Sequence, residues 1–172
     1  LHQSIAHHAI LSMQFKSSVT LLRIEPYYKK YSSLPLLHQG IYQSDGYGTS
    51  KGMDVYLEDH SISSRLTTTL AYSFNDSERL YMDYAEPCTP DFASRHNLRL
   101  TAKYSIGKFI IGIADSYATG RHFVNGITPH YNSLDVNITY LLSPKVIIYS
   151  SLNNVLGRTN IFRYDTYGKG IT

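Results

Sequence analysis

The residues best suited to chemistry are the histidines, the acidic residues and one cysteine, and their spacing does not favour a metal centre. The chain has 8 His. His7 and His8 are adjacent, so in a strand their side chains point to opposite faces and cannot chelate one ion together. The single cysteine, Cys88, excludes an internal disulfide and a cysteine-based zinc cluster. We therefore predict no metal site and no cofactor.

A catalytic site is not favoured either. Asp91 with His96, or Asp83 with His122, could form the acid–base pair of a barrel enzyme. Nothing in their spacing, however, requires the two side chains of either pair to meet. The glycines of GYGTSKG, residues 46–52, are not followed by a helix whose N-terminus could bind a phosphate. The sequence predicts a protein that is not an enzyme.

The composition favours strands and narrows the class of protein. The chain has 16 Tyr and no Trp, and only 17% of its residues are charged. A net charge of +3 without a Lys/Arg block gives no reason to expect nucleic acid as a partner. No stretch approaches the ~18 consecutive apolar residues of a membrane helix. The first residues lack the features of a signal peptide and do not begin with Met, so we expect a mature product or a fragment.

Alternation of apolar and polar residues is the dominant pattern. It is clearest in NLRLTAKYSI, residues 97–106, and it recurs in RLTTTLAYSF and SLDVNITYLL. Weaker segments cover residues 4–15, 19–31, 52–59, 108–118 and 145–152. The sequence thus predicts about eight strands, most of them matching the ~9–11 residues of a tilted membrane strand. Pro26 removes a backbone donor and predicts a bulge within the second strand.

The connections between these segments alternate in length. Short ones are expected near residues 16–18, 61–64, 106–108 and 143–145, and long polar ones at 32–51, 75–94, 119–132 and from 153 onward. Tight turns on one side and long loops on the other are typical of an outer-membrane barrel. A soluble antiparallel sandwich also alternates, because its outer faces are solvated. The long strands and the aromatic residues near strand ends favour the membrane barrel.

Five motifs in chain order resemble the barrel of TonB-dependent outer-membrane receptors, most closely those of the Bacteroidetes type. The strongest is SLNNVLGRTNIFRYD, residues 151–165, which resembles the strand-to-loop signature before the last barrel strand. YATGRHF resembles a TGRP loop start, although His122 stands where Pro is usual. The other three are RIEPYYKKYSSLP, GYGTSKGMDVYL and PDFASRHNLRLTAKY.

The resemblance implies both a fold and a function. Members of the family form a barrel of about 22 strands around an N-terminal plug, in line with large plugged barrels. We therefore predict that residues 1–172 are an all-β, antiparallel transmembrane segment from the C-terminal part of such a barrel, without the plug and the N-terminal strands. The parent protein would bind and import a scarce solute with energy supplied by TonB. The solute could be a siderophore, haem, a glycan, a peptide or a vitamin.

Candidate site residues follow from strand faces and loops. The side chains predicted to face the lumen are Arg23, Glu25, Arg99, Lys103, Asp135 and Asn137. Those predicted to face lipid are Leu98, Leu100, Val136, Ile138, Val146 and Ile148. In the family, ligand is captured by extracellular loops together with the plug. The resemblance therefore makes six loop residues ligand-binding candidates, namely Tyr42, Tyr47, Tyr81, Tyr84, His122 and Phe123.

Two alternatives remain open at this point. One is a complete outer-membrane barrel of about eight strands with a structural or adhesion role. The other is a soluble β-sandwich binding module. For the leading interpretation we expect the outer membrane of a Gram-negative cell as location. The expected partners are membrane lipids, the plug of the same parent chain and the TonB complex, with a surface lipoprotein as a further candidate.

Overall fold

The structure is a computed structural model of the chain, and it describes residues 2–123, 126–164 and 169–172. Within these residues no helix is long and apolar enough to cross a membrane. The strands in chain order are β1 (Ile5–Ile10), β2 (Met13–Lys16), β3 (Thr20–His38), β4 (Ile41–Asp59), β5 (Leu66–Leu80), β6 (His96–Ile106), β7 (Phe109–Ala118), β8 (His122–Phe123), β9 (Gly126–Ile127), β10 (Tyr131–Ser143), β11 (Val146–Leu152), β12 (Arg163–Tyr164) and β13 (Gly170–Ile171).

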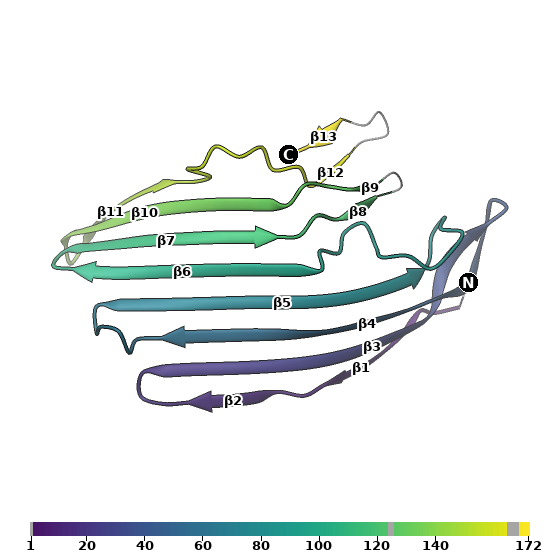
Figure 1. Ribbon diagram of the computed structural model, residues 1–172, viewed down its shortest axis with the longest axis horizontal. Coiled ribbons are helices and arrows are strands. Elements are labelled where there is room, and N and C mark those ends of the chain that lie inside the picture. Colours follow the sequence, from purple (N-terminus) through teal and green to yellow (C-terminus); the bar gives the residue numbers. More distant parts are fainter. Residues whose placement is uncertain (1, 124–125, 165–168) are drawn as a thin grey trace.

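Nine of these strands form one antiparallel sheet (Figure 1). Its order is β1-β3-β4-β5-β6-β7-β10-β11, with β2 also paired to β3, so long strands lie beside their neighbours in the chain. The hairpins β8–β9 and β12–β13 lie outside it. The predicted all-β, antiparallel architecture is confirmed. The described part of β1 and that of β11 lie at opposite edges and are not paired, so the sheet is open.

The region 32–51, predicted as a long loop, is instead a continuation of two strands. β3 extends to His38 and β4 begins at Ile41, and Gln39 and Gly40 make the turn with φ of 49° and 80°. In Figure 1 these strands reach well beyond the ends of β6 and β7, on the side of the long loops. The prediction was wrong because glycines, serines and tyrosines suggest a loop, although here they pair across a ladder. We call residues 27–52 the tall hairpin.

Pro26 does not cause the predicted bulge. It pairs with Met53 without a register shift, and the irregularities of the β3–β4 ladder lie further along, between Tyr31 and Leu36. On the other side, β1 and β2 keep one register against β3 but are interrupted opposite Pro26. A proline lacks the N–H that the ladder needs at this point. Its effect is therefore to split one edge strand in two.

The stagger of the strands is that of a barrel wall. One row of paired residues begins at the first residue of β3 and runs through Thr20, Asp59, Thr68, Ala102, Ile113 and Val136. Val136 is seven residues from the end of β10 at Ser143. Seven residues rise about 23 Å, and the five strand spacings span about 24 Å. The strands are thus inclined by about 45° to the line of short turns, close to the tilt of membrane barrels.

The two faces of the sheet differ sharply. One, the polar face, carries the row Arg23, Tyr56, Ala71, Arg99 and Ser116; the other, the apolar face, carries the row Leu57, Leu70, Leu100, Asp115 and Leu134. Apolar side chains stay exposed on the second face, for example Ile113 at 45% and Ile138 at 46%. Among the described residues the buried apolar side chains are only Pro90, Ala93 and Ala114. A soluble sandwich would bury its apolar face against a second sheet.

Most of the predicted lipid-facing residues share the apolar face. Leu98, Leu100, Val136, Ile138 and Ile148 occupy equivalent positions in the strand register. Val146 lies beyond a register shift near the turn between β10 and β11. The exposed apolar face matches the outward band of a membrane barrel, while contact with lipid itself stays a prediction.

Candidate ligand-facing site on the polar face

The polar face carries every side chain that the sequence analysis assigned to a lumen. The register of the pairs places on this one face Arg23, Glu25, Arg99, Lys103, Asp135 and Asn137. Alternation along each strand sets the face, and pairing between strands aligns it across the sheet. That this face lines a lumen stays a prediction.

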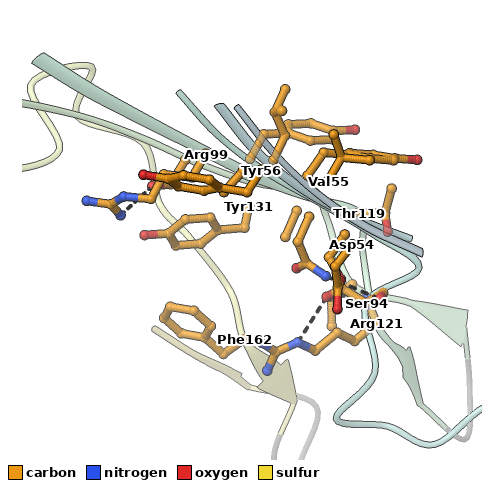
Figure 2. Close-up of a pocket in the computed structure, with 18 of the residues that line it drawn as sticks. Asp54, Val55, Tyr56, Ser94, Arg99, Thr119, Arg121, Tyr131 and Phe162 are labelled. Atoms are coloured by element: carbon orange, nitrogen blue, oxygen red, sulfur yellow. Dashed lines mark hydrogen bonds between the residues drawn. The ribbon is translucent and has the colours of Figure 1, made fainter. Parts of the chain in front are cut away.

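Part of the polar face is hollowed into a cavity of about 550 Å³ (Figure 2). Ala71 and Ser73 of β5 are small, so they leave room between the larger side chains of the neighbouring strands. Tyr56 of β4 lies beside Ala71 on one side and Arg99 of β6 lies beside it on the other. The strands thus provide the floor and two walls of the cavity.

Loop residues cover the same cavity from the side of the long connections. Arg121 donates its Nε–H to Ser94 Oγ at 3.3 Å, and Thr128 Oγ1 accepts the backbone N–H of Arg121 at 2.9 Å. The guanidinium carbon of Arg121 lies 5.8 Å from the ring centre of Phe162. The ring of Phe162 in turn lies 5.4 Å from that of Tyr131 (Figure 2). Segments distant in sequence therefore meet over the polar face.

Two asparagines hold the C-terminal segment in this position. Asn154, with a φ of 50°, donates from Nδ2 to the carbonyl of Arg158 at 2.9 Å and accepts the Arg158 N–H at Oδ1 at 3.2 Å. Asn160 bonds in the same double manner to the backbone of Asn132, at 3.0 and 3.1 Å. The Asn160 amide thus makes with β10 the two hydrogen bonds that the backbone of a neighbouring strand would otherwise make. These asparagine side chains explain why β11 leads into an asparagine-rich loop, since they hold that loop in the turn that brings Phe162 over the cavity.

The charges around the cavity are unequally paired. Arg23 Nε lies 3.4 Å from Glu25 Oε2, and Asp54 accepts a hydrogen bond from Ser73. Arg99 and Arg121 instead donate to the hydroxyls of Ser116 and Ser94. Among the described residues no carboxylate forms an ion pair with either of these two arginines. Their remaining N–H groups could bind an anionic oxygen, because guanidinium donates in a fixed fork.

Three of the predicted loop residues line a second cavity. It measures about 420 Å³ and is lined by Tyr84, His122 and Phe123, together with Cys88. Tyr81 packs against Tyr84 with ring centres 5.3 Å apart. Burial, together with the Asp91 carboxylate, raises the pKa of Tyr84 to about 12. Burial also raises the pKa of the Cys88 thiol, which keeps it protonated near neutral pH.

The remaining predicted site residues lie apart from both cavities. Tyr42 and Tyr47 are on the tall hairpin and are 54% and 53% exposed. Lys103 is exposed on β6, and Asn137 lies over Gly112 of the neighbouring strand. Asp135 accepts hydrogen bonds from the Ser133 hydroxyl and the Asn154 backbone, so it fixes the start of the C-terminal segment. The structure therefore does not unite the predicted residues in one site.

Most residues that line the first cavity were not predicted as site residues, among them the four discussed next. Tyr56 could have been assigned from alternation, because it shares a face with Asp54 in the predicted segment 52–59. Arg121 and Phe162 occur in motifs that resemble the receptor family, but nothing in the sequence shows that they meet. Tyr131 lies at the edge of a predicted loop. Its contact with Phe162 depends on the fold of the C-terminal segment.

The staggered antiparallel sheet resembles parts of solved outer-membrane receptors. The ferric-catecholate import receptor Fiu of E. coli K12 matches 97% of the chain with a TM-score of 0.77 at 12% identity. The ferric yersiniabactin uptake receptor FyuA of Yersinia pestis matches 97% with a TM-score of 0.81 at 11% identity. The chain has the fold of the barrel part of TonB-dependent outer-membrane receptors.

The FrpB iron transporter of Neisseria meningitidis agrees, with 91% coverage, a TM-score of 0.72 and 14% identity. The chain spans only 25 to 27% of the length of these three proteins. These neighbours are transport receptors and not enzymes. No protein-family model and no curated protein sequence matches the chain. The fold class predicted from the sequence, an antiparallel barrel segment, is confirmed.

Proposed function

We propose that the chain is the C-terminal barrel segment of a TonB-dependent receptor of the Bacteroidetes type. The parent protein would bind a scarce solute at the cell surface and import it across the outer membrane with energy supplied through TonB. The observation that supports this most is the polar face. Its cavity is lined by Arg99 and Arg121, which have no acidic partner among the described residues, and it sits in a sheet that matches the barrels of iron-import receptors.

The proposed mechanism needs binding and displacement but no covalent chemistry. The polar face would hydrogen-bond to the plug of the parent chain through groups such as Lys103 and Asn137. The cavity near Arg121 and Phe162 would form one wall of the space where solute enters, because it lies at the end of the sheet that carries the long loops. Pulling by TonB would displace the plug and release the solute inward.

The proposed solute carries anionic oxygens. Guanidinium groups bind carboxylates, phosphates or catecholate oxygens with paired hydrogen bonds, and aromatic rings stack on flat ligand groups. A ferric siderophore fits this chemistry well, and Fiu and FyuA are receptors for ferric catecholates and ferric yersiniabactin. Haem, which carries carboxylates, is the next candidate. A neutral glycan, a peptide or a vitamin would use the arginines less.

The test uses the full receptor in a strain that otherwise lacks iron-import receptors. We expect a labelled ferric siderophore to accumulate only when both the receptor and TonB are present. Arg99→Ala and Arg121→Ala should each lower affinity by about tenfold, as expected for a lost charge-assisted pair. Arg65→Ala, in a short turn at the far end of the sheet, is the matched control. Accumulation that does not require the receptor would contradict the proposal.

The same strain tests the other expected partners. Proposed contacts are membrane lipids on the apolar face and the TonB complex, with a surface lipoprotein as a further candidate. Cell fractionation should recover the receptor in the outer membrane. The alternative of a complete eight-stranded barrel has less support, because β1 and β11 lie at opposite edges of an open sheet.

A further inference from the structure

A carboxylate interrupts the apolar face of the sheet. On this face of β6, β7 and β10, whose residues are all described, Asp115 is the one Asp, Glu, Lys or Arg side chain. It lies in the row between Leu100 and Leu134, two residues before Tyr117 on β7. An ionisable side chain on a lipid-facing surface is costly, so its position calls for a partner.

Asp115 is held in place by a hydrogen bond, but its carboxylate can accept further ones. Asn132, diagonally across from it on β10, donates from Nδ2 to Asp115 Oδ1 at 2.8 Å and contacts the Ser116 carbonyl at 3.3 Å. Among the described residues no donor bonds to the second carboxylate oxygen. A carboxylate accepts several hydrogen bonds, so this oxygen can receive an N–H or O–H from outside the protein.

A groove leads away from this carboxylate across the apolar face. It measures about 400 Å³, its floor is formed by the small residues Thr68 and Ala102, and leucines and Ile113 flank it. Because the strands are inclined, the row of residues beside it runs from Asp115, near the end of β7, to Leu57, near the opposite end of β4. One end of the groove is therefore polar and close to the long loops, and the other is apolar and lies deeper.

We propose that this groove binds an outer-leaflet glycolipid whose acyl chains are attached through amides. The amide N–H or a chain hydroxyl donates to Asp115, and the acyl chain lies over Ala102 toward Leu57. The proposal rests on the outer-membrane location proposed above, because the long loops then face outward and the carboxylate lies in the outer leaflet.

The chemistry of the carboxylate selects this occupant. Glycerol diester lipids present ester oxygens at the acyl linkage, and these only accept hydrogen bonds. An amide linkage supplies the donor that the free oxygen of Asp115 lacks. A protein partner would be expected to cover the exposed Leu100 and Ile113 on both sides of the groove, whereas a single chain needs only the groove itself.

The proposal can be tested on the full receptor purified in detergent. Native mass spectrometry would compare the retention of lipid A, which has amide-linked chains, with that of a phosphatidylglycerol of matched chain length. We expect lipid A to be favoured about tenfold, the size of one charge-assisted hydrogen bond. Asp115→Leu should abolish this preference, and Ala102→Leu should weaken binding of both lipids by filling the groove. Ile138→Leu, on the same face but outside the groove, should change neither.

Equal retention of the two lipids by the unaltered receptor, or a preference that survives Asp115→Leu, would overturn the proposal. So would a receptor that isolates as a dimer through this face. Heat-modifiable migration on a gel shows that each variant is folded, and a leucine suits the apolar face. Lipid binding is measured without transport, so a receptor that imports nothing but keeps its lipid preference would refute the proposed function alone.

Discussion

One face of the sheet changes its chemistry between two regions of the molecule. On β6, β7 and β10 the apolar face carries mostly aliphatic and aromatic residues, and Asp115 is its one Asp, Glu, Lys or Arg side chain. On the tall hairpin and the adjoining end of β5 the same face carries Lys51 and Asp76, which form an ion pair at 3.4 Å. Arg95 approaches Asp76 at 3.7 Å. In the proposed membrane setting, this change would mark the level at which the predicted lipid-facing surface gives way to a surface in water.

The polar face also differs between the two regions. On β5, β6 and β7 its side chains are joined by hydrogen bonds, such as those of Thr69 with Thr101 and of Arg99 with Ser116. In the tall hairpin the aliphatic part of the Arg79 side chain lies over Gly48, and its guanidinium carbon is 4.1 Å from the ring centre of Tyr31. In the proposed setting the tall hairpin extends beyond the bilayer and lacks contact with lipid. We therefore expect packing across its glycines to stabilise it instead.

An arginine added to the apolar face of each region should give the largest difference in stability between the two regions. Ile138→Arg puts a guanidinium on the apolar face of β10 and should cost about 2–4 kcal/mol of unfolding free energy if that face meets lipid as proposed. Thr49→Arg adds the same side chain to that face of the tall hairpin, beside Glu78, and should change stability by less than about 0.5 kcal/mol. Urea unfolding of the receptor in lipid vesicles measures both. Equal costs would mean that the two regions share one environment.

A methyl group added to the tall hairpin should have the next largest effect. In Gly52→Ala the new Cβ would collide with the carbonyl oxygen of Phe74 and with the Tyr27 hydroxyl, so the ladder must shift. We expect a loss of about 1–3 kcal/mol, as for an overpacked site. Thr49→Ala, on the open side of the same strand, is the control. The same unfolding experiment would contradict this packing if Gly52→Ala proved neutral.

The two regions also differ in how far the sequence predicts them. β6, β7 and β10 were predicted well, because a sheet with one apolar and one polar face imposes strict alternation, as in residues 97–106. Residues 32–51 of the tall hairpin were predicted as a loop, because Gly46, Gly48 and Ser50 have no apolar period. Glycines of β4 accommodate the side chains of Tyr27 and Arg79, which belong to the neighbouring strands β3 and β5. A single strand's sequence does not contain that information.

The site was predicted in part for the same reason. Arg23 and Arg99 were assigned to the polar face by alternation, which is local. The meeting of Arg121 with Phe162 depends on how two loops fold back, and in particular on the double hydrogen bonds of Asn154 and Asn160. Asparagine side chains that bond to backbone groups in this way produce no periodic pattern in the sequence. The motif around Asn154 indicated a family likeness but gave no contacts.

High pH should destabilise the loop of residues 81–95, which connects β5 to β6 beside the tall hairpin. Met82 of this loop bonds to the hairpin backbone at Pro35, and Tyr84 packs nearby against Tyr81. The pKa of Tyr84 is raised from 10.0 to about 12, so its neutral form stabilises the loop fully below pH 10 and this contribution is lost as the pH approaches about 12. Proteolysis of the loop should therefore accelerate over that range. Tyr84→Phe should remove this pH dependence, whereas Tyr42→Phe should not.

The smallest effect is expected from the ion pair between Lys51 and Asp76. The side chains of Lys51 and Asp76 are 66% and 39% exposed, so their attraction is screened by solvent. A double-mutant cycle with Lys51→Ala and Asp76→Ala should give a coupling of no more than about 0.5 kcal/mol, and salt should reduce it. Arg95 also approaches Asp76, so Asp76→Ala alone should cost slightly more than Lys51→Ala. A coupling of several kcal/mol would place the pair in a low-dielectric setting. The boundary between lipid-facing and water-facing surface would then lie further out along the hairpin.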